Sequence, residues 1–434
     1  MSRPERLTPS SEGGGTEFRP ARRRWAGLGA LAVGSISDAT EGGLVNTLFP
    51  VIRQSLGLGI EALGILTSIN RFSRMIFGPL WSLASDRYGR KRVLVIVTGL
   101  WGLWTAAVGL AQNFQQLVIL YSIAVIGSVA GEPITNGLLA DLFGRNERGK
   151  AYGTIRSLGS LGSMVLTPLL ARLAGVPDGW RYGMFIMGAL SVLSGVLIWF
   201  LVDEPSRAQA ADGQPTESFR WADAGTLFKT PSFVLMAGML PLVTSLVFGA
   251  FFVTYFVEVR GWSTPNSALL YTAFSGGWAV SSLIGGFLGD LFERRMGPNG
   301  RVLLMQIYLL SFSALTFVFM QIDWGVGAAL YVIAFLTGLV GSVGFSGCVL
   351  PMVSSIVPPA LSATAFALLF SLIQGCFSAV LSLAMGNLAA AYGLQRMMFW
   401  LVTVPYAVNA VYWFLFYPFY PRDRAAMAGG ATRP

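Results

Sequence analysis

Five charged side chains fall deep inside long apolar segments of this 434-residue chain: Asp38 with Glu41, Arg71 with Arg74, and Glu132. At about 1.5 Å per helical residue, counted from the end of each segment that borders a cluster of basic residues, all five lie about 18–24 Å deep. An unpaired charge at such a depth costs at least about 2.5–3.5 kcal/mol. We therefore expect these groups to face one another or a watery cavity. The members of each pair are three residues apart, so we expect them to share a helix face.

These residue types predict proton transfer. Three carboxylates against two guanidiniums leave one carboxylate without a cationic partner. An arginine keeps its proton, whereas desolvation favours the neutral form of a carboxyl group. We expect one of Asp38, Glu41 and Glu132 to bind and release a proton, with Asp38 and Glu132 as first choices. Arg71 and Arg74 would be counter-ions or substrate anchors. The alternative is a permanent ion-pair network that only stabilises the fold, or an arginine that reaches the membrane interface.

The second half of the chain has no charge in the middle of an apolar segment, but many aromatic residues. A cavity with charges on one wall and aromatic rings on the other suits an amphipathic or organic-anion substrate. Single aromatic residues in such segments can equally be packing or lipid-facing groups. Besides the two arginines, the candidate substrate contacts are Asn136, Phe248, Tyr255, Trp278 and Gln374.

Composition limits the function classes. Hydrophobic residues make up 54% of the chain and charged residues 12%, which is typical of a membrane protein. There is no histidine, and both cysteines, Cys348 and Cys376, lie in apolar runs. We therefore expect no metal site, no cofactor and no enzymatic activity. The net charge of +9 comes from cations at segment ends, so nucleic-acid binding is not expected.

Twelve apolar segments are long enough to cross about 30 Å of hydrocarbon. A polar linker, 203–230, separates two halves, 25–202 and 231–420, and tails 1–24 and 421–434 flank them. The sequence thus predicts an all-α membrane protein with two six-helix bundles related by pseudo-two-fold symmetry. The estimated spans are 25–50, 62–84, 93–112, 116–142, 151–174, 181–202, 232–257, 267–290, 301–320, 325–349, 360–390 and 397–417.

Orientation follows from the cations. With the first residue inside, the tails and inner loops hold 22 of the 30 Lys and Arg residues, and the outer loops and outer span ends hold five. This asymmetry predicts that both termini are cytoplasmic, in the cytoplasmic (inner) membrane of a cell.

The segment 78–94, GPLWSLASDRYGRKRVL, joins the second and third predicted spans, and a weaker copy, GGFLGDLFERR, lies about 200 residues further on. Together with twelve spans in two halves, this loop resembles that of the major facilitator superfamily of secondary transporters. Four further segments are similar to motifs of that family: 141–148 (DLFGRNER), 179–181 (GWR), 203–205 (DEP) and 357–364 (VPPALSAT).

The resemblance implies alternating access, in which two bundles rock around a site near the bilayer midplane. It also implies a monomer with a small-molecule substrate, surrounded by membrane lipid. It also implies that the residues matching the loop motifs form a cytoplasmic gate. The alternative is that their cations only determine the orientation of the chain in the membrane. The residues are Asp86, Arg87, Gly89, Arg90 and Asp141, with Asp290 in the second copy.

Finer features point in several directions. Asp38, Gly131 and Glu132 resemble the spinster-type lysolipid transporters, although Ala39 stands where those carry arginine. Many proton-coupled exporters of the superfamily carry an arginine at the position of Ile123. We expect proton-coupled export of a small amphipathic molecule. The alternatives are a lysophospholipid or sphingolipid transporter, an organic-anion importer, and a receptor or scaffold without transport.

Overall fold

The computed structural model describes residues 21–143, 145–203, 225–358 and 361–428. The predicted tail up to residue 20, the linker residues 204–224 and the last six residues lie outside the described part. Helix α1 (Ala21–Leu56) begins before the predicted first span, and helix α21 (Phe416–Ala428) runs past the predicted last one. The inner ends of both predicted tails are therefore helical.

The N-terminal bundle contains six helical spans. Its third span is interrupted by a π-helical stretch, and its fourth is broken into two helices. The elements are α1, α2 (Glu61–Tyr88), α3 (Arg90–Leu94), a π-helix (Val95–Leu100), α4 (Gly102–Val108), α5 (Phe114–Ser128), α6 (Gly131–Leu142), α7 (Arg145–Ala171), a 3-10 turn (Arg172–Gly175) and α8 (Gly179–Leu201).

The C-terminal bundle repeats the pattern with more interruptions, and most of its spans are built from several pieces. The elements are α11 (Pro231–Met239), a 3-10 turn (Leu240–Leu242), α12 (Ser245–Glu258), α13 (Thr264–Met296), α14 (Pro298–Gln321), α15 (Ala328–Gly341), a π-helix (Phe345–Val349), α16 (Leu350–Ile356), α17 (Ser362–Phe366), a π-helix (Ala367–Ile373), α18 (Gln374–Tyr392), α19 (Leu394–Met398), a π-helix (Phe399–Thr403), α20 (Val404–Tyr412), a 3-10 turn (Trp413–Leu415) and α21.

Among the described residues, ten helical stretches are long and apolar enough to cross a membrane, and the first of them begins at Arg90. Helices α1 and α2 have 36 and 28 residues, so both exceed the length needed to span the bilayer. They carry the charged pairs, which lower their hydropathy. With these two helices the described residues contain twelve helical segments of spanning length, the number that the sequence predicts.

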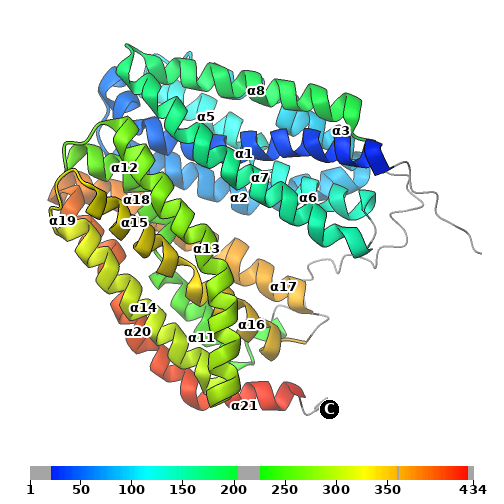
Figure 1. The fold of residues 1–434 in the computed structure, drawn as a ribbon, viewed down its shortest axis with the longest axis vertical. Coiled ribbons are helices and arrows are strands. Elements are labelled where there is room, and N and C mark those ends of the chain that lie inside the picture. Colours follow the sequence, from blue (N-terminus) through cyan, green and yellow to red (C-terminus); the bar gives the residue numbers. More distant parts are fainter. Residues whose placement is uncertain (1–20, 144, 204–224, 359–360, 429–434) are drawn as a thin grey trace, which may run out of the picture.

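The two bundles touch at one end of the molecule and diverge at the other (Figure 1). We call the end that holds the turn at Gly89, between α2 and α3, the basic side. The bundles diverge toward the basic side, where α3 and α6 point away from α16 and α17. At the opposite side, α1 contacts α12, α2 contacts α18, and α7 contacts α13. The molecule therefore opens toward its basic side.

The contact at the opposite side depends on a close helix crossing and an ion pair. Gly64 of α2 lies against α18, and a Cβ at this position would come within 2.5 Å of the Ser382 carbonyl oxygen and 3.0 Å of the Gly386 Cα. Small residues let membrane helices approach this closely. Near the same end, Arg53 of α1 forms a salt bridge with Glu258 of α12. Both contacts join one bundle to the other.

Candidate functional site

A central cavity of about 510 Å³ lies between the bundles, and a smaller cavity of about 240 Å³ adjoins it. The larger cavity is lined by α1, α2 and α7 on one wall and by α12 and α13 on the other. The smaller one is lined by α1 and α2 alone. The two share four lining residues: Ala39, Gly42, Asn46 and Arg71. Their combined volume falls in the range of small-molecule sites.

The structure brings three of the five predicted mid-membrane charges to this place. Asp38, Arg71 and Arg74 all line the smaller cavity, and Arg71 also lines the larger one. Arg71 donates one hydrogen bond across the bundle interface, from Nη2 to the Leu246 carbonyl at 3.4 Å. Its Nε is buried and has no hydrogen-bond partner among the described residues. The guanidinium of Arg71 thus retains capacity to bind an acceptor.

A break in the fourth span makes room for Asp38. Helix α5 ends at Ser128 and α6 begins at Gly131, because Pro133 has no N–H for the helical bond to the Val129 carbonyl. A Cβ at Gly131 would come within 1.9 Å of the Asp38 Oδ2 atom. The carboxylate therefore occupies space that any side chain at Gly131 would fill, beside the first turn of α6.

Glu41 points elsewhere, contrary to the prediction that it shares a face with Asp38. Its Oε1 accepts a hydrogen bond of 2.6 Å from Thr105, and its Oε2 accepts one of 3.4 Å from Ser191. These partners lie on α4 and α8, inside the N-terminal bundle. Residues three apart on an α-helix differ by about 60° in direction, which is enough to send the two carboxylates to different sides of α1.

Glu132 has a partner that the sequence analysis left out. Its Oε1 lies 3.3 Å from Nη2 of Arg156 on α7, and both side chains are mostly exposed. Counting Arg156, the predicted spans of this half contain three carboxylates and three guanidiniums, so the predicted excess of one carboxylate is wrong as a count. Of these six groups, only Glu132 and Arg156 form a salt bridge within the described residues. Within the two cavities the balance is reversed, since Asp38 is accompanied by Arg71 and Arg74.

The C-terminal wall contains one of the predicted aromatic contacts. Trp278 of α13 lines the larger cavity, together with Tyr271 and Phe274 of the same helix. Phe274 stacks with Tyr271 at 6.0 Å between ring centroids and lies 5.8 Å from Trp278. Hydroxyl groups from α7 and α13, such as Ser163 and Ser275, complete the lining. This wall offers apolar rings and neutral hydrogen-bonding groups.

Two other predicted aromatic contacts are packing residues in this structure. Phe248 and Tyr255 are completely buried within the C-terminal bundle. Phe248 packs edge-on against Phe252 and Phe274, and the hydroxyl of Tyr255 donates to the Met320 carbonyl. The side of α12 that lines the cavity carries smaller residues instead, among them Gly249 and Ala250. This mostly apolar helix gave no sequence signal for which of its sides faces the cavity.

Two predicted polar contacts also lie away from these cavities. Gln374 is the first residue of α18 and is half-buried. Asn136 lies in the middle of α6, where its carbonyl accepts a 2.8 Å hydrogen bond from Tyr152. In contrast, Asn46 and Asn70 line the cavities and were missed. The signal that could have found them is their spacing on the charged helices, eight residues after Asp38 and one before Arg71.

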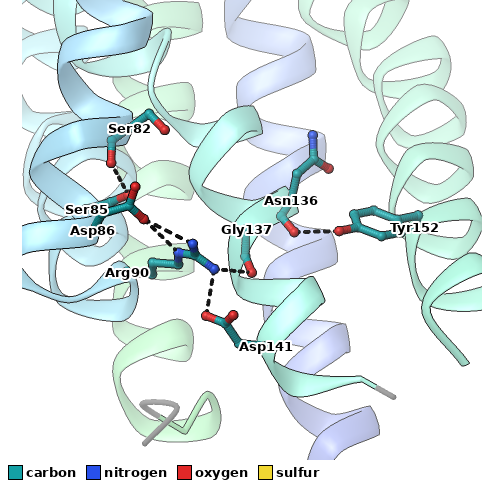
Figure 2. Close-up of polar contacts among 8 residues, drawn as sticks. All are labelled: Ser82, Ser85, Asp86, Arg90, Asn136, Gly137, Asp141 and Tyr152. Carbon is teal, nitrogen blue, oxygen red and sulfur yellow. Dashed lines mark hydrogen bonds and ion pairs between the residues drawn. The ribbon is translucent and has the colours of Figure 1, made fainter. Parts of the chain in front are cut away.

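Three of the predicted gate residues, Asp86, Arg90 and Asp141, form a compact network at the basic side of the N-terminal bundle (Figure 2). Arg90 binds Asp86 through Nε and Nη2 at 3.2 and 3.0 Å, and its Nη1 lies 2.8 Å from both Asp141 and the Gly137 carbonyl. Gly89 provides the turn with a φ of 100°. The guanidinium of Arg87 lies over the Tyr88 ring. The drawn contacts of Arg90 stay within one bundle.

The second copy of the motif has an equivalent network whose cation was not predicted. Asp290 pairs at 2.8 Å with Arg301 of α14, rather than with the arginines that directly follow it in the sequence. Arg301 also binds Glu293 and the Gly347 carbonyl. Arg424 of α21 binds Glu293 from the other side. Arg90 and Arg301 thus occupy matching positions, each at the start of a span and each bound to a glycine carbonyl.

Comparison with known proteins agrees with this architecture. The family model described as Major Facilitator Superfamily matches residues 31–382, which is most of the chain. This protein belongs to the major facilitator superfamily. It is accordingly a multi-pass membrane transporter and not an enzyme.

Individual members of the superfamily resemble this one at lower levels. A bacterial homologue of the human lysosomal transporter spinster, solved in an inward-facing and occupied conformation, superposes with a TM-score of 0.79 at 17% identity, over 93% of this chain and 99% of that one. The D-xylose–proton symporter gives a TM-score of 0.67, also at 17% identity, over 91% of this chain and 98% of that one. At these identities the likeness concerns the fold alone.

Two curated relatives are 26% identical. One is the "Multidrug resistance protein MdtG" of Yersinia enterocolitica, aligned over 72% of this chain and 75% of its own length. The other is the "Probable sulfoacetate transporter SauU" of Cupriavidus necator, aligned over 58% of this chain. This chain spans 62% of the length of SauU.

Proposed function

We propose that this superfamily member is a proton-coupled secondary transporter that carries a small organic molecule through the central cavity by alternating access. The observation that carries the proposal is the placement of Asp38. It lines a cavity between the bundles together with Arg71 and Arg74, and it approaches α6 where the fourth span is broken. Broken helices near the midplane are typical of coupled transport sites.

Asp38 is the proposed proton carrier among the three candidate carboxylates. Glu41 is already hydrogen-bonded by Thr105 and Ser191 inside the bundle, and Glu132 is paired with Arg156. Asp38 forms no salt bridge within the described residues, so its charge can change without breaking a permanent ion pair. Buried ionisable groups in membrane spans commonly serve proton relays.

The basic side is proposed to be cytoplasmic, with both termini on that side of the cytoplasmic membrane. The distribution of the cations supports this orientation. The bundles diverge toward the basic side, so the structure would then be an inward-facing state (Figure 1). In the outward-facing state, Asp86, Arg90 and Asp141 would contribute to the cytoplasmic gate.

Coupling of the substrate to protons can take two forms, and the name of one relative is consistent with each form. Exchange of the substrate for protons would give export, as the sequence analysis expects, and MdtG is named as a multidrug resistance protein. Movement together with protons would give uptake. Positive charge in the cavity favours this second form. SauU is named as a probable sulfoacetate transporter, and sulfoacetate is an anion.

The test is transport in proteoliposomes under an imposed pH gradient, with ethidium and sulfoacetate as trial substrates. Asp38→Asn should abolish the pH-driven component while exchange of labelled for unlabelled substrate persists. Glu132→Gln should lower it less, because its carboxylate lies outside the two cavities. If both variants retain the full pH-driven rate, the proposal is wrong.

A further inference from the structure

Charge in the central cavity is distributed unequally. Among the described residues, the ionisable side chains that line the two cavities are Asp38, Arg71, Arg74 and Tyr271. Two permanent cations therefore face one carboxylate, and the tyrosine is neutral in its ordinary form. The C-terminal wall supplies no further charge. The cavity carries an excess positive charge whether or not Asp38 is ionised.

This excess charge is not neutralised by a fixed partner. Within the described residues, neither Arg71 nor Arg74 forms a salt bridge, and the Nε of Arg71 is buried without an acceptor. The one hydrogen bond of Arg71, to the Leu246 carbonyl, is long at 3.4 Å. A guanidinium has five donors in a planar fork that matches carboxylate and sulfonate oxygens. The unused donors point to an anionic ligand.

The opposite wall defines the remainder of that ligand. Trp278, Tyr271 and Phe274 form a continuous aromatic surface along α13. An apolar body can rest on this surface while its anionic group binds the arginines of α2. The larger cavity, at about 510 Å³, limits the body to the size of a small ring or short chain.

Asp38 competes with such a ligand. When it is ionised, its carboxylate is a built-in anion in the cavity that holds Arg71 and Arg74. The other charges that act on it are Glu41 on its own helix and Glu132 on α6, and both are negative. A proton on Asp38 removes the competing anion and raises the positive potential at the arginines. Proton binding and anion binding must therefore strengthen each other, and by linkage the effect is reciprocal.

We infer that the substrate is a small organic monoanion with an apolar body, held by Arg71 and Arg74 against the Trp278 wall, and that it moves together with a proton on Asp38. This inference rests on the proposed function and gives it a substrate class and a direction. A cation or a neutral drug would leave the arginines unpaired in a desolvated site, which is costly. Proton cotransport also leaves the anion with no net charge to carry across.

The test is equilibrium binding to the purified full-length protein by calorimetry between pH 5 and pH 8. The probes are benzenesulfonate, which stays ionised throughout, its neutral analogue benzamide, and the cation benzyltrimethylammonium. We expect benzenesulfonate to bind at least about tenfold more tightly than either analogue, and its affinity to rise about tenfold or more as the pH falls. Preference for the cation or the neutral probe would overturn the inference.

Variants separate the roles of the two charges. Arg71→Gln should lose about tenfold or more in benzenesulfonate affinity. Asp38→Asn should bind benzenesulfonate as tightly at pH 8 as the wild type does at pH 5, with no pH dependence. Arg172→Gln, which removes an exposed cation of the same bundle outside the cavities, is the matched control and should bind as the wild type does.

The outcomes distinguish this inference from the proposed function. An Asp38→Asn protein whose benzenesulfonate affinity keeps the wild-type pH dependence would overturn the inference, as would equal losses in Arg71→Gln and Arg172→Gln. Either result would leave proton-driven transport of another solute intact, because the liposome assay measures that separately. Loss of proton-driven transport with normal pH-linked binding would instead contradict the proposed function.

Discussion

The two bundles share a fold and differ in what they place at its centre. The N-terminal bundle puts Asp38, Arg71 and Arg74 beside the cavity, whereas the C-terminal bundle offers Trp278 and Tyr271. At the basic side the difference is smaller, because each bundle has one arginine that binds carboxylates and a glycine carbonyl. The two bundles thus match in the arginine networks at the basic side and differ in the residues beside the cavity.

The largest expected effect comes from the pair of equivalent arginines. Arg301 is buried, with a relative exposure of 6%, and it binds two carboxylates, so Arg301→Gln should lower the free energy of unfolding by about 3–5 kcal/mol. Arg90→Gln should cost about 1–3 kcal/mol, because that side chain is 24% exposed. Thermal unfolding of both variants in the same detergent measures the difference. Equal losses would mean that the two networks are energetically equivalent.

A second prediction separates the packing aromatics from the cavity aromatics. Phe248→Leu should lower the stability of the fold by about 1–2 kcal/mol because it leaves a void among fully buried rings, without changing ligand affinity. Trp278→Leu should do the reverse: it should weaken binding of benzenesulfonate several-fold with a smaller change in stability. Unfolding and calorimetric titration of the same two preparations test this. Loss of affinity in Phe248→Leu alone would show that the wall is assigned to the wrong residues.

The smallest effect concerns the contact between the bundles. The side chains of Arg53 and Glu258 are 33% and 25% exposed. Their salt bridge should therefore stabilise the conformation in which the opposite side is closed by no more than about 1 kcal/mol. Arg53→Gln and Glu258→Gln should each shift the balance between the two conformations by a few-fold. Spin-label distances between Gln112→Cys and Val326→Cys, both at that end, would report the shift. Additive effects in the double variant would show that the pair is not coupled.

Much of this architecture could be predicted because hydrophobic length and cation placement determine it. The twelve spans and the two copies of the basic loop follow from those patterns alone. Partner choice did not follow, because it depends on how helices rotate and cross. The direction of Glu41 was wrong for this reason, and Arg156 and Arg301 were not recognised as partners of Glu132 and Asp290. The sequence around an arginine on one span does not indicate which carboxylate on a neighbouring span it will pair with.

The cavity was predicted less well on its aromatic side than on its charged side. A charged residue inside an apolar segment is rare, so Asp38 and Arg71 stand out in the sequence. Phe248 and Tyr255 lie in a helix that is apolar on every side, and such a helix gives no periodic signal of orientation. Only packing decides that Gly249 and Ala250 line the cavity while their neighbours fill the core.

Gly131 gives Asp38 its position by having no side chain. Helix α6 carries none of the proposed ligand contacts, yet a methyl group added at residue 131 would displace the Asp38 carboxylate from its position beside that helix. The proton chemistry proposed for Asp38 on α1 therefore depends on the absence of a Cβ atom at residue 131, which belongs to a different span. A survey of natural variants at residue 131 would therefore show, without any assay of transport, whether a side chain is tolerated beside the Asp38 carboxylate.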